Sequence, residues 1–246
     1  MAFYEEISDY YDSLFPPGKE QLDFICKAAG NPPRALLDIA CGTGGYAVEL
    51  AGLGYDVTAA DIDAAMLDIL KNKLGERPGN ISCIRAGMLE LAEKLKTKFN
   101  LAFCIGNSIA HLNGKDEIQA FLKSAKGLLK KDGGLIVQII NFDRVLLKDI
   151  KELPVIINEE AGLVFRRFYR YDKDAGRVFF RTILTAGDKS FDNEIPLYPL
   201  LSGETAEMLK AAGFEKIRMF GDFNGSAFDA HGSYMLVLWA SGSRES

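Results

Sequence analysis

The sequence predicts an α/β fold in which a doubly wound sheet holds the ligand site, with a smaller antiparallel β segment added near the end. A short apolar run passes through a glycine-rich turn into a helical stretch at residues 34–51, and further apolar runs alternate with helical segments as far as residue 140. Residues 154–195 differ, because they are rich in residues that favour strands. At 246 residues with 48% hydrophobic side chains, the chain can bury a large core.

The first landmark is a strand that ends in a glycine-rich turn. Residues 34–39 are small and apolar, and a Pro-Pro pair before them prevents a preceding helix. Gly42 and Gly44 let the backbone bend tightly and let a ligand approach without meeting a Cβ atom. The free N–H groups at the start of the next helix, expected over residues 46–51, can donate to a polar or anionic group. A ligand pocket is therefore expected at this turn.

Two acidic residues frame the turn. Residues 42–47 fit the pattern G-x-G-x-x-A, which occurs in proteins that bind dinucleotides. Asp61 ends the next expected strand, about 20 residues further on, where a carboxylate can accept hydrogen bonds from both hydroxyls of a ribose. Asp38 lies in the strand before the glycines, where a nicotinamide-binding strand usually carries an apolar residue. The pattern thus predicts a nucleoside-containing ligand, and Asp38 disfavours a nicotinamide.

The other elements follow from apolar spacing and from breaks at glycine and proline. The expected helices cover residues 3–14, 19–29, 64–74, 119–130 and 203–212. The expected strands cover 57–61, 81–85, 99–105, 135–140, 214–220 and 233–240, with a Lys-Asp-Gly-Gly turn at 131–134.

The whole pattern resembles the class I S-adenosylmethionine-dependent methyltransferases, in which an acid precedes the glycines as Asp38 does. The segments at 106–112, 141–144 and 221–223 are similar to those of the glycine N-methyltransferase-like group. The resemblance covers nearly the whole chain. It implies a Rossmann-like doubly wound seven-stranded sheet whose last strand is antiparallel. It also implies S-adenosylmethionine as the cofactor and direct in-line methyl transfer to a small-molecule acceptor, such as an amine or amino acid.

The resemblance implies a cofactor site at the first four strand ends. Tyr11 belongs to a Tyr-Tyr-Asp segment that covers the cofactor in many relatives, although an aromatic stripe on a docked helix explains it equally well. Lys19 is placed either to meet the cofactor carboxylate or to stay solvated. Ile62 and Met66 are placed to pack on the adenine. Many relatives bind the adenine amino group with an acid where this chain has Gly87, so the backbone or Met88 is expected to make that contact here. The implied residues are Tyr11, Lys19, Asp38, Ala40, Gly42, Gly44, Asp61, Ile62, Met66, Gly87, Met88 and Gly106.

The acceptor is expected beyond the end of the fourth strand, where ligands bind in open α/β sheets. By the same resemblance, Asn107 and Arg144 are candidate substrate-binding residues. His111 has two open interpretations, a packed structural histidine or a catalytic one. We assign no catalytic acid or base, because a neutral amine can attack an electrophilic methyl group once it is held in line. No cluster of residues has metal-ligand spacing, so no metal is expected.

Residues 154–195 are expected to form an antiparallel insertion over the active site, added to a cofactor-binding core of residues 1–153 and 196–246. Its two clearest strands, 164–171 and 177–185, are joined by a turn. We expect this insertion to select the acceptor and not to hold the cofactor. Its arginines either form a solvated face or create a positive field for a carboxylate-bearing acceptor: Arg166, Arg167, Arg170 and Arg177.

Composition excludes several classes of protein. The net charge of -5 argues against nucleic acid as a partner, because phosphate binding needs a basic surface. No apolar run approaches the roughly 18 residues of a membrane span, and the acidic, aromatic N-terminus does not fit a signal peptide. The four cysteines lack paired spacing, which indicates reduced thiols in a cytoplasmic protein. A nicotinamide-dependent oxidoreductase and a non-catalytic S-adenosylmethionine-binding module are the alternatives, and the oligomeric state stays open.

Overall fold

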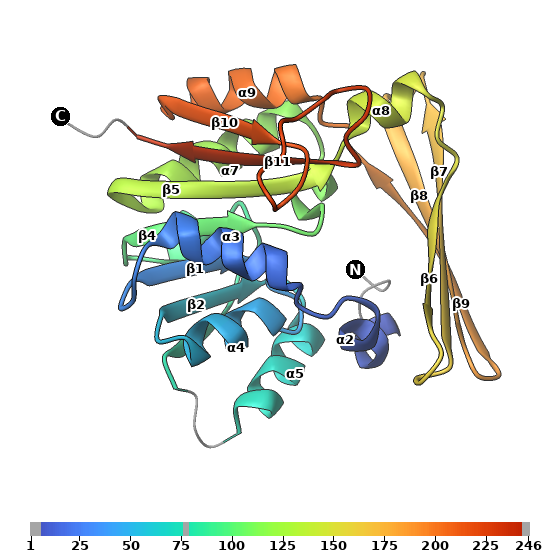
Figure 1. The fold of residues 1–246 in the computed structure, drawn as a ribbon, viewed down its shortest axis with the longest axis horizontal. Helices are drawn as coiled ribbons and strands as arrows, with labels where there is room; N and C mark the ends of the chain where they lie inside the picture. The colour runs from blue at the N-terminus through green and yellow to red at the C-terminus, as the bar shows by residue number, and fades with distance from the viewer. Residues whose placement is uncertain (1–5, 76–78, 243–246) are drawn as a thin grey trace.

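The computed structural model describes residues 6–75 and 79–242, which contain two separate sheets (Figure 1). The larger sheet has seven strands in the order β10-β11-β5-β4-β1-β2-β3. They are β1 (Ala35–Ile39), β2 (Asp56–Asp61), β3 (Ile81–Arg85), β4 (Phe99–Cys104), β5 (Leu129–Ile140), β10 (Lys216–Phe220) and β11 (Met235–Ser241). From β3 to β5 neighbouring strands are parallel, whereas β11 is antiparallel to β5 and β10. The predicted Rossmann-like sheet with an antiparallel last strand is confirmed.

Helices cover both faces of this sheet. One face carries α3 (Lys19–Ala29), α4 (Gly45–Gly52) and α5 (Ala64–Leu74), and the other carries α6 (Leu91–Lys94), α7 (Lys115–Leu128) and α9 (Ser202–Ala211). Leu36 and Leu37 are neighbours in β1 but belong to opposite core clusters, because side chains alternate across a strand. None of the described helices is long and apolar enough to cross a membrane.

The strand order reverses between β1 and β4. β2 and β3 are added on one side of β1, and the chain then crosses back to place β4 and β5 on the other side of β1. In open α/β sheets, ligands bind outside the carboxyl ends of the strands at this point. The glycine turn follows β1, and Gly106 follows β4, so both loops meet there. Two short helices, η2 (Ser108–His111) and α8 (Phe142–Leu147), follow β4 and β5 at the same edge.

The second sheet is antiparallel, and it stands beside the carboxyl edge of the first (Figure 1). Its strands are β6 (Glu152–Asn158), β7 (Leu163–Asp172), β8 (Arg177–Ala186) and β9 (Lys189–Leu197). The sequence predicted only the two central strands. The outer two contain Pro154 and Pro196 and several charged residues, which weaken a strand pattern but are tolerated at sheet edges.

The N-terminal segment packs against the second sheet. It consists of η1 (Ser8–Tyr10) and α2 (Tyr11–Leu14), while residues 3–5 of the helix expected over 3–14 lie outside the described residues. A small apolar cluster joins it to the sheet: Ile7, Leu14, Leu163, Phe165 and Leu184. The second sheet therefore supports the segment that carries Tyr11.

Two predicted boundaries are wrong. β5 begins at Leu129, so residues 131–134 continue the strand instead of forming a turn. Phe99 of β4 pairs with Leu129 of β5, but Leu101 pairs with Gly134, so the register between the two strands shifts at this point. The glycine segment is therefore an irregularity within β5. α7 begins at Lys115, one turn earlier than expected, with two acids in its first turn that stabilise a helix start.

Candidate active site

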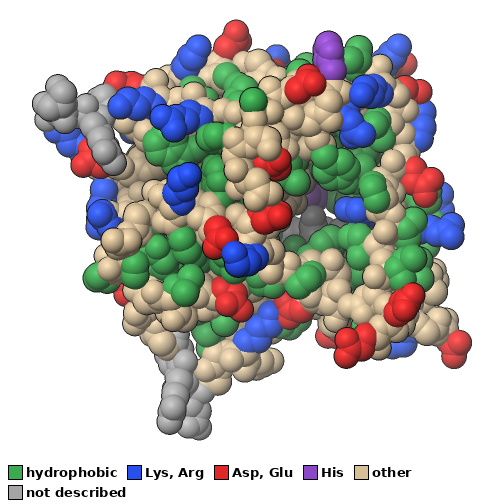
Figure 2. Space-filling view, in the orientation of Figure 1, with side chains coloured by type: hydrophobic (Ala, Val, Ile, Leu, Met, Phe, Trp, Pro, Cys, Tyr) green, Lys and Arg blue, Asp and Glu red, His purple; other side chains and the backbone are tan. Residues whose placement is uncertain are grey.

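A cavity of about 440 Å³ lies between the carboxyl edge of the larger sheet, the N-terminal segment and the second sheet. Figure 2 shows the molecular surface hollowed in this region. The N-terminal segment contributes Tyr11, Leu14 and Phe15, the region of the glycine turn contributes Ala40, Cys41, Thr43 and Tyr46, and the second sheet contributes Leu153, Phe165, Arg167, Tyr169 and Phe180. Among the described residues, no Asp or Glu lines this cavity.

The glycine turn is closely packed on both sides. Ala40, Gly42 and Gly44 have φ angles of 58°, 56° and 74°, in the left-handed region that favours glycine. A Cβ atom at Gly44 would lie 2.4 Å from Cδ1 of Leu70, and one at Gly42 would lie 3.2 Å from Cε1 of Tyr11. The backbone conformation and the close side chains therefore favour glycine at both positions, whereas Ala40 holds the same conformation with a Cβ atom.

Two buried carboxylates lie beside this turn. Asp61 accepts hydrogen bonds from the Gly42 N–H at 2.8 Å and the Asp63 N–H at 2.9 Å, and burial nevertheless raises its pKa. Asp38 is only 3% exposed, and its Oδ2 atom has no hydrogen-bond partner among the described residues. Burial, and then the charge of Asp61, raise the pKa of Asp38 well above its usual range. An unpaired buried carboxylate is costly, so this end of the cavity favours a positively charged ligand.

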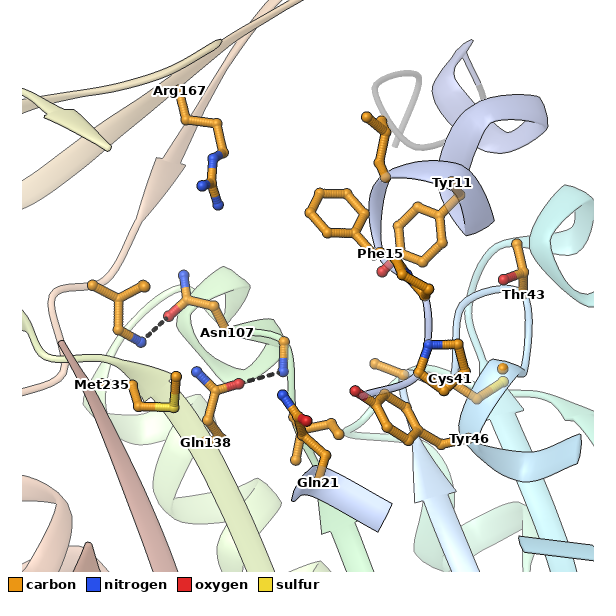
Figure 3. A pocket seen from close by; sticks show the side chains of 18 of the residues that line it. Tyr11, Phe15, Gln21, Cys41, Thr43, Tyr46, Asn107, Gln138, Arg167 and Met235 are labelled. Atoms are coloured by element: carbon orange, nitrogen blue, oxygen red, sulfur yellow. Dashed lines mark hydrogen bonds between the residues drawn. The ribbon is translucent and has the colours of Figure 1, made fainter. Parts of the chain in front are cut away.

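Asp12 fixes the N-terminal segment to the glycine turn. The Thr43 hydroxyl donates to Oδ1 of Asp12 at 2.6 Å, and Nζ of Lys73 lies 2.6 Å from Oδ2. Lys73 also donates to the backbone carbonyl of Thr43 at 2.9 Å. Tyr11, the neighbour of Asp12, contacts the turn at Gly42. These bonds place the Tyr11 side chain in the wall of the cavity (Figure 3).

Gln138 holds the loop after β4. The Gly106 N–H donates to Oε1 of Gln138 at 2.7 Å, and the Asn107 N–H donates to the Gln138 carbonyl at 3.2 Å. Oδ1 of Asn107 accepts from the Ile140 N–H at 3.1 Å (Figure 3). These bonds fix Asn107 at a φ of 69° and place it in the cavity wall. Gly106 and Asn107 thus lie at the cavity, where they were predicted.

His111 ends η2 and lines the same cavity. Burial lowers its pKa to about 4. The imidazole is therefore neutral at physiological pH and can accept or donate a hydrogen bond without adding a charge.

Only one of the four predicted arginines lines the cavity. Arg167 points toward its interior (Figure 3). Arg166 is exposed, and Arg170 pairs with Glu194 at 3.2 Å on the solvent side. Arg177 donates to the Asn113 carbonyl and lies over the Tyr198 ring. Of the two open interpretations, the positive field toward the cavity is therefore available to Arg167 alone, because alternation along the strands directs the other three side chains elsewhere.

Lys19 and Arg144 do not line the cavity, contrary to the roles predicted for them. The Lys19 side chain is 89% exposed and pairs with Asp23 at 3.0 Å, because it occupies the first, solvent-facing turn of α3. Arg144 faces a separate hollow beside Glu152 and lies over the Tyr234 ring at 5.7 Å. Its helix α8 starts at the cap formed by Asn141, whose Oδ1 atom accepts from the Arg144 N–H at 3.2 Å.

The residues predicted to surround adenine lie outside the lining of this cavity. Ile62 is exposed, and a Cβ atom at Gly87 would come within 3.2 Å of its Cδ1 atom, so these two positions are neighbours. Met66 is buried in the core, and Met88 packs at its edge. Sequence reasoning missed Gln138, Phe15, Tyr46 and Tyr169. Gln138 carried a usable signal, since it is a polar residue within an otherwise apolar strand.

Comparison with known proteins agrees with this architecture. A family model described as Methyltransferase domain matches residues 36–133. The glycine/sarcosine N-methyltransferase of Parasynechococcus marenigrum is 26% identical over 91% of this chain and 79% of its own length, and that of Halorhodospira halochloris is 26% identical over 87% and 77%. The CcbJ methyltransferase structure from Streptomyces caelestis matches with a TM-score of 0.81 at 24% identity, covering 97% of this chain and 96% of its own. That likeness shows the fold.

These matches favour a methyltransferase over the nicotinamide-dependent oxidoreductase and the non-catalytic module, because the matched family and the named relatives are methyltransferases. The Asp38-to-glycine segment and Asp61, on which the prediction rested, both lie in the matched region. The matched domain, the named relatives and the fold together support a class I S-adenosylmethionine-dependent methyltransferase.

Proposed function

We propose that this enzyme transfers the methyl group of S-adenosylmethionine to the nitrogen of a small-molecule amine. The observation that carries the proposal is a single cavity that joins the glycine turn to an apolar chamber under the second sheet. The relatives named glycine/sarcosine N-methyltransferases support a nitrogen acceptor. When bound, the cofactor supplies a methyl group that is already electrophilic, because it is carried on a positively charged sulfur.

The glycine-turn end suits that cofactor. The Oδ2 atom of Asp38 is buried without a hydrogen-bond partner among the described residues, and a cationic ligand nearby would favour the ionised form of this carboxyl group. Asp61 uses one bond on each oxygen for backbone N–H groups, and each carboxylate oxygen can accept a second bond from a ribose hydroxyl. We assign Tyr11, Ala40, Gly42, Gly44 and Gly106 to this half of the site. Ile62 and Gly87 form a neighbouring surface that we assign to adenine.

The other end suits a neutral amine. Its walls are mainly apolar, so a bound acceptor is shielded from water. His111 is uncharged and can accept a hydrogen bond from the amine, which orients the nitrogen lone pair without adding positive charge. The nitrogen loses its proton to solvent after transfer, so no buried base is required. In this proposal Asn107 shapes the acceptor wall and residues 154–195 select the acceptor.

Incubation with methyl-labelled S-adenosylmethionine and a panel of amines tests the proposal. The panel pairs each amine with the alcohol of the same carbon skeleton. We expect label on nitrogen, located by mass spectrometry, and none on the matched alcohols. Transfer to oxygen or carbon alone, or to no amine in a panel that includes amino acids and amino sugars, would contradict the proposal.

A further inference from the structure

The inner face of β7 presents a regular row of side chains to the cavity. Phe165, Arg167 and Tyr169 line it, whereas Arg166 between them is exposed. This is the two-residue alternation of a strand with one buried face. Phe180 adds to the row from β8, where it pairs opposite Tyr169. Arg167 is therefore a charged residue set into an otherwise aromatic surface.

Arg167 has no counter-ion within the described part of the protein. Its Nη2 atom donates to the Pro154 carbonyl at 2.8 Å, while its Nε atom is buried and has no partner. The described lining holds no carboxylate, and the other titratable cationic group, His111, is neutral. A partly buried guanidinium with an unused N–H group is costly, and a bound anion would remove that cost. Arginine binds carboxylates through two parallel hydrogen bonds, which Nε and one terminal nitrogen can provide.

The surroundings of Arg167 favour an apolar molecule. The ring centroids of Phe15 and Phe165 lie 5.7 Å apart at nearly right angles, and those of Tyr169 and Phe180 lie 5.4 Å apart. Leu14, Leu153 and Met235 complete this part of the lining. A ligand that uses the whole chamber would bury apolar surface against these side chains, which a two-carbon acceptor cannot do.

We infer that the acceptor carries a carboxylate on an apolar or aromatic body, with Arg167 binding the carboxylate and the row on β7 and β8 packing against the body. This rests on the proposed methyl transfer to an amine, and it makes Arg167 the residue that determines acceptor class. The alternative is a structural role in which Arg167 only ties β7 to β6 through Pro154.

Binding of three small probes tests the inference without requiring turnover. The probes are 3-phenylpropanoate, its neutral analogue 3-phenylpropanamide, and acetate, each titrated by calorimetry into enzyme saturated with the demethylated cofactor. We expect 3-phenylpropanoate to bind about tenfold tighter than either of the others, because only it offers both groups.

Two substitutions assign the preference to one side chain. Arg167→Met should abolish the advantage of the carboxylate over the amide, whereas Arg166→Met, on the outer face of the same strand, should leave it unchanged. Binding of the amide reports whether the chamber is intact in each variant. If Arg167→Met does not fold, Arg167→Lys replaces it, and the preference should shrink because lysine cannot form the two parallel bonds.

Several results would overturn the inference: equal binding of carboxylate and amide, a preference that survives Arg167→Met, or acetate binding as tightly as 3-phenylpropanoate. Loss of both the carboxylate and amide affinities in a folded Arg167→Met variant would instead show the structural role. If the enzyme methylates amines but shows no preference for the carboxylate probe, the proposed function stands and the inference about Arg167 is wrong. If the enzyme prefers the carboxylate probe but methylates no amine, Arg167 binds carboxylates and the proposed function is wrong.

Discussion

The two ends of the cavity differ in the charged residues near them, although the two acids do not themselves line it. Asp38 and Asp61 are buried acids beside the glycine turn, whereas Arg167 is the charged side chain in the described lining at the second sheet. A cofactor with a positively charged sulfur suits the first end, and a carboxylate suits the second. We therefore expect electrostatic attraction to guide the cofactor to the glycine-turn end and the acceptor to the end near Arg167.

The two ends also differ in construction. Most of the glycine-turn end comes from one β-α-β unit, residues 35–61, whose backbone bonds hold Asp61 in place, and only Tyr11 and Gly106 are assigned to it from outside that unit. The other end is assembled from the N-terminal segment, the loop after β4, β5 and the second sheet. An end formed by one short stretch of sequence should keep its ligand when distant residues are substituted. An end formed by several distant segments can change its ligand specificity through such substitutions. The following predictions test this division.

The largest effect is expected at Asp61. Asp61→Ala removes the carboxylate assigned to the ribose, and a hydrogen bond to a charged group is worth roughly 1.5–3 kcal/mol. Cofactor affinity measured by calorimetry should fall about tenfold or more, with the affinity for 3-phenylpropanoate less affected. Asp68→Ala, on the exposed side of α5, is the matched control. Unchanged cofactor affinity would show that Asp61 does not hold the ribose.

Asp38 should lower stability in the absence of ligand. Its pKa in the folded protein is raised, so the ionised form destabilises the fold fully above that pKa. This penalty decreases as the pH falls from the folded pKa toward the pKa of the unfolded chain, about 4, and is absent below the latter. Asp38→Asn should raise the free energy of unfolding by roughly 1–3 kcal/mol at pH 8 and by progressively less in acid. It should also weaken cofactor binding. A variant that is less stable than the wild type at pH 8 would contradict this account.

Asp12 should control how long the cofactor stays bound. Asp12→Ala removes the bonds to Thr43 and Lys73, so the segment bearing Tyr11 should open more often. The dissociation rate of the cofactor, followed by stopped-flow displacement, should rise several-fold. Asp23→Ala removes only the exposed pair with Lys19 and should leave this rate unchanged. A rate that does not respond to Asp12→Ala would show that the segment is no barrier to release.

The smallest effect concerns the backbone at Ala40. A φ of 58° costs alanine roughly 1–2 kcal/mol relative to glycine, partly offset by the greater freedom of glycine in the unfolded chain. Ala40→Gly should therefore stabilise the protein by up to about 1 kcal/mol in denaturant unfolding. Ala47→Gly, in the interior of α4, should destabilise it. Destabilisation by both substitutions would show that Ala40 is not strained.

The same division explains what the sequence could predict. The glycine turn, Asp38 and Asp61 are local features predicted from spacing and residue type, whereas the antiparallel last strand was predicted from the resemblance to the methyltransferase family. The acceptor end depends on contacts between distant segments, so Phe15, Tyr169 and Phe180 gave no signal of their own. Alternation along β7 would have separated Arg167 from Arg166 and Arg170 once the inner face was known. Arg144 lies at a separate hollow and over the Tyr234 ring, and such contacts between distant segments are not revealed by residue type.

A crystal structure of the enzyme with the demethylated cofactor and 3-phenylpropanoate tests the central claim most directly. The account predicts ribose hydroxyls within hydrogen-bond distance of the Asp61 carboxylate. It also predicts the probe's carboxylate paired with Arg167 in the same cavity. A cofactor bound away from the glycine turn, or a probe whose carboxylate points away from Arg167, would contradict it.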